Sequence, residues 1–451
     1  MGRLFGTDGV RGIANTDLNP ERAMEIGRAA ATILSEGCRR RPTFVIGSDT
    51  RASSDMLSAA LIAGLCSVGA DVIQLGVVPT PAVAYLVGKY KADAGVMVSA
   101  SHNPAEFNGI KIFSGNGLKL PDILEERIEE LVLDRTRPMP QAIGGEVGRL
   151  SYAKTACADY IRHVRSSAYT SLEGLRVAID CANGSASATA PELFRKMGAD
   201  VHVLHATPDG TNINQNCGST HMESLASYVV AHNLDLGIAF DGDADRCLCV
   251  DEKGELVDGD RIMAICALDL KKRGKLYRNT VVGTVMTNFG FSKFCEEHDL
   301  RFIATKVGDR YVLEEMLQED YSFGGEQSGH IIFRDFATTG DGQLTAIQLL
   351  TLMKAEGKPL SELASVMPRY PQIIVNLPVS SEGKIVFYTD PEVNAVIEET
   401  KEALGKTGRI LVRPSGTEPL IRIMAEGLDE AQIEEVSAKI AKVITDRLAS
   451  L

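Results

Sequence analysis

Three stretches of the chain share one arrangement of hydrophobic and polar positions. Each begins with a short apolar run, passes through a loop of small and polar residues into a helical stretch, and ends in a second apolar run: residues 44–76, 176–204 and 280–305. An apolar run of this length without alternation is typical of a strand buried on both faces of a parallel sheet. The pattern therefore predicts three βαβ units.

The first two stretches also leave their helices in the same way. Residues 69–72 and 198–201 both read Gly-Ala-Asp-Val. A glycine just after the last helical residue is a common C-cap, because it adopts the left-handed conformation without steric cost. The shared ending supports an internal repeat at the level of whole domains.

Each unit continues into a further apolar segment that ends in a polar loop. The segments are residues 94–98, 236–240 and 321–323, and the loops read SASHNP (99–104), DGDADR (241–246) and GGEQSGH (324–330). In open α/β sheets, ligands bind beyond the carboxyl ends of the strands. We therefore expect the three loops to face one cleft.

The C-terminal part of the chain breaks this repeat. Its pattern predicts a strand over 371–378, a helix over 391–404, strands over 409–414 and 420–426 around a turn, and an amphipathic helix over 429–449. The expected fold class is α/β, with three related α/β domains with mixed sheets around a central cleft plus a smaller C-terminal α+β domain. The expected domains span residues 1–150, 151–257, 258–368 and 369–451.

Composition and charge narrow the possible functions. The chain has 451 residues, enough to bury a large core without disulfides or structural metals. Its 47 basic and 60 acidic residues give a net charge of −13, which argues against a nucleic-acid or anionic-membrane binder. Anionic small substrates remain compatible, because a few local arginines and lysines reverse the field near a site.

Cysteine usage and hydropathy indicate the compartment. There are nine cysteines and no C-x-x-C pair, which favours a reducing, cytoplasmic location. We find neither a signal-peptide pattern nor an apolar run of the roughly 18 residues that a membrane helix needs. The sequence leaves the oligomeric state open, a homodimer included.

The loop over 241–246 carries the clearest candidate metal ligands. Asp241, Asp243 and Asp245 alternate directly after an apolar strand, so their carboxylates can converge on one hard cation. A solvated acidic turn is the alternative. A calcium-binding EF-hand is excluded, because Arg246 occupies the position that requires glycine. Arg246 beside three acids indicates a site for both a cation and an anion.

The other loops offer groups that suit a phosphorylated, polyhydroxylated ligand. In the first loop only hydrogen-bond geometry can decide whether His102 activates Ser101; a plain turn closed by Pro104 is the alternative. Glu326, Ser328 and His330 suit a polyol. The C-terminal turn offers two guanidinium and two hydroxyl groups, a set that suits a phosphate: Arg413, Ser415, Thr417 and Arg422. An ordinary connection between two strands is the alternative.

Several common enzyme classes are not supported by the sequence. It contains no Walker loop, and no G-x-G-x-x-G follows a predicted strand, which argues against P-loop and nicotinamide enzymes. The G-x-S-x-G element of an esterase elbow is also missing.

Taken together and in this order, the four loops resemble those of the α-D-phosphohexomutase family over essentially the whole chain. Family members have three related α/β domains and a smaller fourth. Residues 5–12, 325–330 and 413–419 are most similar to bacterial members that act on glucosamine phosphates and feed UDP-N-acetylglucosamine synthesis; members acting on glucose or mannose phosphates usually differ at Gln327 and Gly416. A sister mutase, a phosphatase and a catalytically silent sugar-phosphate sensor are the alternatives.

The resemblance implies a role for each site residue. Ser101 would be phosphorylated and, with Asp241, Asp243 and Asp245, bind one Mg²⁺ per active site. Arg246 would steady the phosphoryl group, Arg11 would orient the phosphoserine, His102 would lie beside it, and Lys111 or His330 would serve as general acid/base. Glu326 and Ser328 would contact the sugar, and the non-reacting phosphate would be held by Arg413, Ser415, Gly416, Thr417 and Arg422.

The implied reaction passes through a hexose 1,6-bisphosphate, which also serves as activator. Because the intermediate must turn end for end, either phosphate has to fit the same binding loop. We therefore expect the fourth domain to move as a hinge.

Overall fold

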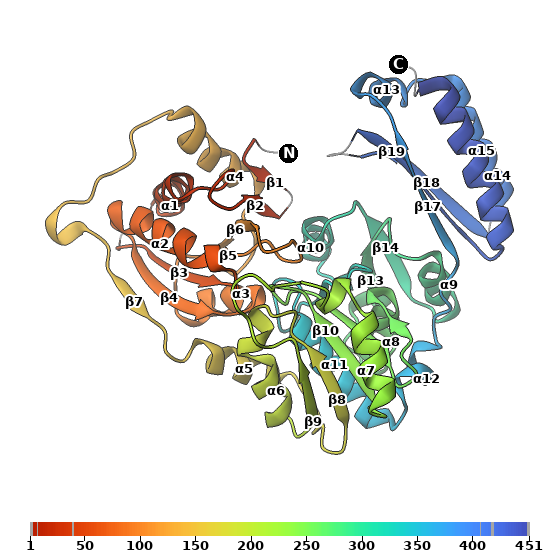
Figure 1. Ribbon diagram of the computed structural model, residues 1–451, viewed down its shortest axis with the longest axis horizontal. Helices are drawn as coiled ribbons and strands as arrows, with labels where there is room; N and C mark the ends of the chain where they lie inside the picture. Colours follow the sequence, from red (N-terminus) through yellow and green to blue (C-terminus); the bar gives the residue numbers. More distant parts are fainter. Residues whose placement is uncertain (1–2, 7, 38–39, 406, 416–418, 449–451) are drawn as a thin grey trace. The chain divides into compact units, whose positions relative to one another are not determined.

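The computed structural model of the chain describes residues 3–6, 8–37, 40–405, 407–415 and 419–448 (Figure 1). The chain divides into two compact units. The first comprises the chain up to Met286 together with Leu300–Val366, and the second comprises Thr287–Asp299 together with the chain from Met367 onward.

The first unit begins with a seven-stranded sheet in the order β1-β2-β6-β5-β3-β4-β7. Its strands are β1 (Phe5–Gly6), β2 (Gly9–Ile13), β3 (Thr43–Ser48), β4 (Asp71–Val77), β5 (Ala94–Val98), β6 (Phe107–Ser114) and β7 (Leu150–Tyr152). Its helices are α1 (Pro20–Leu34), α2 (Ala52–Ser67), α3 (Thr80–Lys89) and α4 (Asp122–Glu129).

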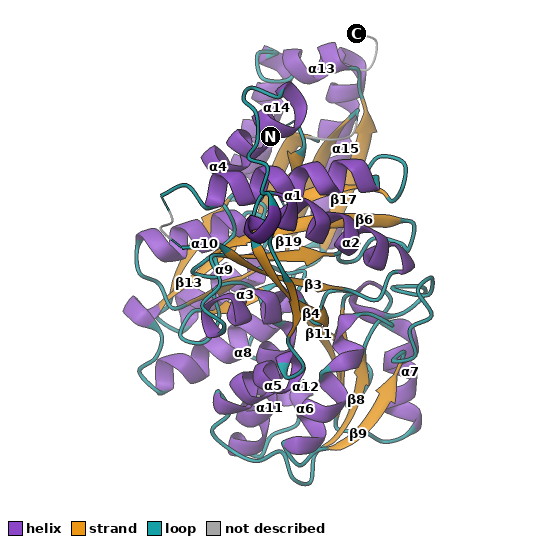
Figure 2. Ribbon diagram, turned by 90° about the vertical axis from the view of Figure 1, so that its left-hand side faces the viewer, coloured by secondary structure: helices purple, strands orange, loops and turns teal. Residues whose placement is uncertain are grey.

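The second sheet has five strands in the order β12-β11-β10-β8-β9. They are β8 (Arg176–Asp180), β9 (Asp200–Leu204), β10 (Leu236–Phe240), β11 (Cys247–Asp251) and β12 (Leu256–Val257). The helices of this part are α5 (Ala156–Ser166), α6 (Ala190–Lys196) and α7 (Glu223–Ala231). Figure 2 shows β8 and β9 side by side, with α6 and α7 flanking them.

The third sheet has four strands in the order β14-β13-β15-β16. They are β13 (Thr280–Thr284), β14 (Arg301–Thr305), β15 (Phe323–Gly325) and β16 (Ile331–Phe333). The helices that belong with it in the first unit are α8 (Gly259–Lys272), α10 (Asp309–Gln318), α11 (Gly342–Glu356) and α12 (Leu360–Ala364). Single helical turns occur at Glu130–Asp134, Gly144–Glu146, Ser185–Ala188, Gly218–Thr220 and Tyr277–Asn279.

The three sheets share one four-stranded topology. In each, the first strand lies between the second and the third, these three run parallel, and the fourth pairs antiparallel with the third. Every residue of β5, β10 and β13 is buried, as the unalternated apolar runs predicted. Gly69 and Gly198 both adopt φ +94°, so both follow their helices as left-handed C-caps. The expected three related α/β domains with mixed sheets are confirmed.

This topology places the three polar loops at equivalent positions. Each lies between the third, parallel strand of its sheet and the antiparallel fourth, namely after β5, after β10 and after β15. Since these strands share their direction with the parallel core, the loops all follow carboxyl ends of strands.

The second unit contains a three-stranded antiparallel sheet in the order β17-β19-β18. Its elements are β17 (Gln372–Pro378), β18 (Gly408–Pro414), β19 (Leu420–Gly427), α13 (Ser381–Val386), α14 (Pro391–Leu404) and α15 (Glu430–Leu448). Helices α14 and α15 cover one face of the sheet (Figure 1), and the apolar stripe of α15 at Ile433, Ile440 and Ile444 is fully buried there. The smaller α+β domain is confirmed.

Helix α9 (Phe289–Glu297) belongs to this second unit although it lies between β13 and β14 in the chain. The link is the buried carboxylate of Glu426 on β19. It accepts hydrogen bonds from Asn288 Nδ2 at 3.2 Å and from the backbone N–H of Phe289 at 3.1 Å, and it pairs with Arg409 at 2.6 Å. In the two repeats before it, the equivalent helices α2 and α6 remain in the first unit.

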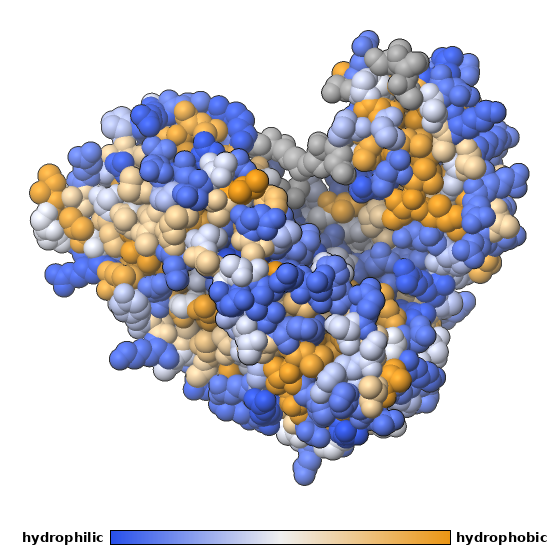
Figure 3. Space-filling view, viewed as in Figure 1, coloured by the Kyte–Doolittle hydropathy of each residue, from blue (hydrophilic) through white to orange (hydrophobic). Residues whose placement is uncertain are grey.

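The eight cysteines within the described ranges are all free thiols. Hydrophilic residues predominate on the face drawn in Figure 3, with hydrophobic ones in small groups between them. Among the described helices, none combines the length and the apolar character needed to cross a membrane.

Candidate active site

The polar loops of the three sheets meet in the first unit. Ser101 Oγ, in the loop after β5, donates a hydrogen bond of 2.6 Å to Asp241 Oδ2, in the loop after β10. Arg246, at the end of that second loop, forms an isolated antiparallel bridge with His330, at the end of the loop after β15. Residues far apart in the sequence are thus brought to one place, as the repeat predicted.

Ser101 is held in a conformation that a serine seldom adopts. Its φ is +51°, in the left-handed region. Its N–H donates to Ser99 Oγ at 3.0 Å, and its carbonyl accepts from Arg51 Nη2 at 3.0 Å and Asn214 Nδ2 at 2.9 Å. A strained residue of this kind persists only where its surroundings fix it, which is common at reacting groups.

Arg51 holds the Ser101 loop through hydrogen bonds to its backbone carbonyls. It was not among the site residues predicted from the sequence. Its guanidinium is buried against Asp49, with Nε 2.8 Å from Oδ2. The remaining N–H groups donate to carbonyls of the loop: Ser101, Asn103, Pro104 and Phe107. The sequence signal for this role was the segment Asp49-Thr50-Arg51 directly after a buried strand, where two oppositely charged residues indicate a structural or functional role.

Asp241, Asp243 and Asp245 form a buried cluster whose carboxylate oxygens lie within 4.8 Å of one another. Burial, together with the charges of Asp245 and Asp243, raises the pKa of Asp241 well above its usual range. Oδ1 of Asp243 and Oδ1 of Asp245 are buried and have no hydrogen-bond partner among the described residues. Carboxylate oxygens that repel one another and lack hydrogen bonds are the donor set that a hard divalent cation satisfies.

Lys111, on β6, is the cation that the structure provides for this cluster. Its Nζ lies 2.8 Å from Asp243 Oδ2, 2.9 Å from Asp8 Oδ2 and 3.3 Å from Asp245 Oδ2. Burial opposes its charge, yet Asp243, Asp8 and Asp245 raise the pKa of Lys111 well above its usual value. In this arrangement Lys111 is therefore protonated, and it can donate a proton but not accept one.

His102 and Arg11 flank Ser101. His102 Nδ1 lies 3.4 Å from Ser101 Oγ. Burial, with the neighbouring charges of Arg246 and Arg11, lowers the pKa of His102 to about 4, so its imidazole is neutral at pH 7. Arg11 donates to Asn103 Oδ1 at 3.2 Å, within the Ser101 loop, and pairs with Asp8 at 2.5 Å.

Arg246 presents a cation next to the acidic cluster. Its backbone N–H donates to Asp241 Oδ1 at 3.2 Å, and its Nε lies 4.0 Å from Asp245 Oδ1. Nε of Arg246 has no hydrogen-bond partner among the described residues. Burial works against the charge, but Asp241, Asp245 and Glu326 raise the pKa of Arg246. A guanidinium with an unused donor suits a phosphoryl oxygen.

The loop after β15 supplies Glu326, Ser328 and His330. Glu326 Oε1 accepts from the backbone N–H of Gly308 at 3.1 Å, and burial raises its pKa. Nε2 of His330 lies 3.2 Å from Asp309 Oδ2. Ser328, between Glu326 and His330 in the chain, is exposed. The expected grouping of Glu326 and His330 is thus present in the structure.

A chain of charges that the sequence analysis missed joins this loop to the first sheet. Lys119 Nζ pairs with Asp8 Oδ1 at 2.5 Å and with Asp309, which in turn contacts His330. Burial opposes the charge of Asp8, yet Lys111, Lys119 and Arg11 hold its pKa well below the usual range. No local sequence pattern marks these residues, because Lys119 and Asp309 are 190 positions apart.

In the second unit, Arg413 and Arg422 occupy directly opposite positions on β18 and β19, so their side chains share a face of the sheet. Like charges in this register are unfavourable unless an anion joins them. Arg422 Nε donates to Asn376 Oδ1 at 2.8 Å, and the N–H of Ser415 donates to the carbonyl of Leu420 at 2.8 Å. The predicted residues Gly416 and Thr417 lie outside the described residues.

Four family models of phosphoglucomutase/phosphomannomutase match the chain in order. They are alpha/beta/alpha domain I over residues 2–138, domain II over 158–254, domain III over 258–370, and the C-terminal domain over 374–443.

Curated relatives match over nearly the whole length. The phosphoglucosamine mutase of Caldanaerobacter subterraneus subsp. tengcongensis is 56% identical over 449 residues, covering 99% of this chain and 100% of that protein. The phosphoglucosamine mutase of Clostridium novyi is 53% identical over 447 residues, covering 99% of each.

Solved structures match in fold at lower identity. A phosphoglucomutase/phosphomannomutase family protein from Burkholderia thailandensis superposes with a TM-score of 0.84 at 22% identity, covering 99% of both chains. N-acetylphosphoglucosamine mutase of Aspergillus fumigatus, solved in complex with GlcNAc-6P and magnesium, gives a TM-score of 0.70 at 17% identity, covering 98% of this chain and 95% of that one.

Proposed function

The chain belongs to the phosphoglucomutase/phosphomannomutase family of α-D-phosphohexomutases, and from this we propose that it interconverts glucosamine 6-phosphate and glucosamine 1-phosphate. The sugar assignment is supported by relatives called phosphoglucosamine mutase that match end to end. The structural observation that carries the chemistry is the 2.6 Å contact between Ser101 Oγ and Asp241 inside a buried acidic cluster. It joins the proposed phosphorylated hydroxyl to proposed metal ligands.

The proposed metal ion is Mg²⁺, held by Asp241, Asp243, Asp245 and an oxygen on Ser101. The oxygen-only donor set and the two buried carboxylate oxygens without a hydrogen bond support a hard cation. When bound, such an ion neutralises the charge that develops on a phosphoryl group during transfer.

In the first half-reaction, phosphoserine 101 gives its phosphoryl group to the free hydroxyl of the sugar phosphate. The bond between phosphorus and Ser101 Oγ breaks, and a bond to the sugar oxygen forms, giving the 1,6-bisphosphate. Arg246, with its unused Nε donor, is proposed to hold the phosphoryl oxygens during transfer. Arg11 and Arg51 keep the Ser101 loop in place through Asn103 and the loop carbonyls.

The attacking hydroxyl must lose a proton, and Lys111 is the proposed acceptor. Lys111 shares Asp243 and Asp245 with the proposed metal ion. If these two carboxylates held the ion, Lys111 would keep only Asp8 of the three partners that raise its pKa, which would bring it closer to the neutral amine that accepts a proton. His330, beside Asp309, is the second candidate, and the neutral His102 lies next to Ser101 Oγ.

In the second half-reaction the bisphosphate turns end for end and returns its other phosphoryl group to Ser101. Glu326 and Ser328 are proposed to bind the sugar hydroxyls. The paired Arg413 and Arg422, with Ser415, Gly416 and Thr417, are proposed to hold whichever phosphate is not reacting. A loop that recognises phosphate alone serves both orientations of the sugar.

The remaining proposals concern the cellular location and the class of substrate. The free thiols of the described cysteines support a reducing, cytoplasmic location, and the acidic net charge supports a small-molecule substrate in preference to nucleic acid or membrane.

A phosphorus NMR time course tests this function. Protein, Mg²⁺ and catalytic glucose 1,6-bisphosphate are mixed separately with glucosamine 6-phosphate, glucose 6-phosphate and mannose 6-phosphate. We expect glucosamine 1-phosphate to appear fastest and Ser101→Ala to abolish turnover with an intact fold. Faster turnover of a neutral sugar would overturn the sugar assignment. Free phosphate or no anomeric phosphate would point to the phosphatase or the sensor.

A further inference from the structure

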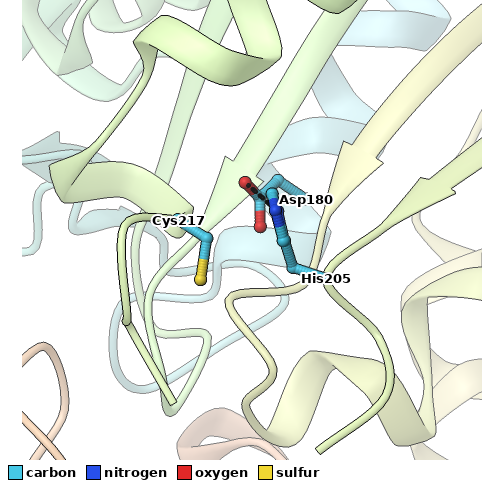
Figure 4. A group of neighbouring side chains, drawn as sticks. All are labelled: Asp180, His205 and Cys217. Atoms are coloured by element: carbon cyan, nitrogen blue, oxygen red, sulfur yellow. Dashed lines mark hydrogen bonds and ion pairs between the residues drawn. The ribbon is translucent and has the colours of Figure 1, made fainter. Parts of the chain in front are cut away.

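A second cluster of metal-ligating side chains lies outside the proposed active site. Asp180 is the last residue of β8, His205 follows β9, and Cys217 precedes the turn at Gly218–Thr220. Figure 4 shows the three side chains beside one another, and their donor atoms all lie within 4.8 Å of one another. These three residues take no part in the proposed reaction.

We propose that Asp180, His205 and Cys217 bind one thiophilic divalent cation of the Zn²⁺ type. Sulfur, imidazole nitrogen and carboxylate oxygen are the ligands from which proteins build zinc sites, and three protein ligands leave a fourth position for water. The oxygen-only cluster of Asp241, Asp243 and Asp245 has the opposite preference, for a hard cation. The two clusters therefore select different metals.

The carboxylate of Asp180 is already fixed for this role. Its Oδ1 accepts from the N–H of Ala182 at 2.8 Å, and its Oδ2 accepts from the N–H of Gly218 at 3.0 Å and contacts His205 Nδ1 at 2.9 Å. An ion bound between Asp180 Oδ2 and His205 Nδ1 would take the place of this 2.9 Å contact, while the N–H groups of Ala182 and Gly218 keep the carboxylate oriented.

Burial and access also fit a bound ion. The side chain of Asp180 and the residue Cys217 are fully buried, while the His205 side chain is 34% exposed, so a cation can reach the cluster from the His205 side. Binding at Cys217 replaces the thiol proton, which goes to solvent as the metal–sulfur bond forms. Zinc and cobalt form such bonds, whereas magnesium does not.

The site is coupled to the Ser101 loop through Asn214. Asn214 lies between His205 and Cys217 in the chain, and its backbone N–H donates to the carbonyl of Ala182. Its side-chain Nδ2 donates to the carbonyls of Ser101 at 2.9 Å and Asn103 at 3.0 Å. An ion joining His205 and Cys217 to Asp180 would tie the segment that carries Asn214 to the end of β8.

Cobalt binding in excess Mg²⁺ tests the proposal spectroscopically. A thiolate–cobalt charge-transfer band in the near ultraviolet should appear with one Co²⁺ per chain, and equimolar Zn²⁺ should remove it. The band identifies a thiolate ligand, because cobalt held by the three aspartates alone has no sulfur, and its loss in Cys217→Ser identifies that ligand as Cys217. No band, or a band that survives in Cys217→Ser, would overturn the proposal.

Matched variants separate the ligands from general damage to the fold. His205→Gln should weaken cobalt binding at least about tenfold. Cys66→Ser, which changes a half-buried cysteine on α2, should leave the band unchanged. Near-ultraviolet circular dichroism of each variant checks the fold.

A measurement on the unaltered protein keeps the test independent of variants. Crystals equilibrated with Zn²⁺ in excess Mg²⁺ should show an anomalous zinc peak among Asp180, His205 and Cys217. A peak only among Asp241, Asp243 and Asp245, or no zinc peak, would contradict the second site.

Discussion

Ser101 combines a left-handed backbone with a hydroxyl that donates to Asp241, and its carbonyl accepts a hydrogen bond from Arg51. The buried guanidinium donates to four carbonyls of the loop while its charge is balanced by Asp49. A planar fork with five donors fits several carbonyls at once, and a lysine ammonium does not. We infer that Arg51 positions the hydroxyl that is proposed to react.

Replacing Arg51 by Lys should lower kcat by about tenfold or more with little change in KM, because the Arg51 side chain is fully buried and its donors are used by the Ser101 loop. The unpaired loop carbonyls should also cost about 2–4 kcal/mol of stability. Steady-state kinetics at saturating Mg²⁺ and urea unfolding measure the two effects.

The exposed Arg22→Lys serves as the matched control and should change neither quantity. An Arg51→Lys enzyme that keeps the kcat of the unaltered protein would show that the loop holds Ser101 without this guanidinium.

Two helices begin with a capping aspartate, and the surroundings shift the pKa values of the two carboxyl groups in opposite directions. Asp341 caps α11 and accepts from the N–H of Leu344 at 2.9 Å and from Tyr160 Oη at 2.8 Å, but burial raises its pKa to about 6. Asp390 caps α14, where the N–H of Val393 and the Arg447 charge outweigh burial and lower its pKa.

These shifts predict opposite pH dependences. For Asp341 the folded state retains a proton that the unfolded state loses above about pH 4, so its contribution to stability falls as pH rises to about 6. Asp341→Asn keeps the cap acceptor and should stabilise the first unit at pH 7 by about 1–3 kcal/mol, an advantage that disappears toward pH 4.

Asp390→Asn is the matched comparison. The lowered pKa of Asp390 stabilises the folded state above the unfolded pKa, so this variant should be less stable at pH 7 and the difference should shrink as pH falls. Urea unfolding of both variants from pH 4 to 8 measures the trends. If the stabilities of the two variants depended on pH in the same way, the opposite pKa shifts of Asp341 and Asp390 would be contradicted.

The sequence predicted elements with a strong local signal and missed contacts that have none. The helix over 391–404 and the strand over 420–426 follow from periodicity and match α14 and β19 to within one residue. The loop positions followed from the repeat. The contacts of Arg51, Lys119 and Asp309 join distant segments, and the packing of α9 against Glu426 depends on tertiary structure that no periodicity encodes.

At the scale of the whole molecule, the proposed chemistry is divided between two compact units. The first carries Ser101, the acidic cluster and the sugar loop, and the second carries Arg413 and Arg422. The chain passes between the units three times, after Met286, Asp299 and Val366. Domains joined by such connections commonly move as rigid bodies about hinges.

Small-angle scattering should therefore differ between the free protein and the protein saturated with glucose 1,6-bisphosphate and Mg²⁺. Because the proposed substrate-binding residues lie on both units, the radius of gyration should change on binding. Arg413→Ala in combination with Arg422→Ala removes the proposed phosphate-binding pair and should abolish the change. Superimposable profiles of the free and saturated protein would exclude the hinge.

A single-turnover experiment on the phosphorylated protein tests the proposed phosphoryl transfer. The protein is phosphorylated with glucose 1,6-bisphosphate whose phosphate groups carry oxygen-18, freed of small molecules, and mixed with Mg²⁺ and less than one equivalent of unlabelled glucosamine 6-phosphate. Mass spectrometry with peptide mapping and phosphorus NMR then locate the label. We predict that labelled phosphoryl leaves Ser101 and appears on C1 of the sugar, in glucosamine 1,6-bisphosphate and glucosamine 1-phosphate, while unlabelled phosphoryl from C6 appears on Ser101 in an amount equal to the glucosamine 1-phosphate formed. Label that stays entirely on the chain, maps to another residue or emerges as free phosphate would contradict this prediction.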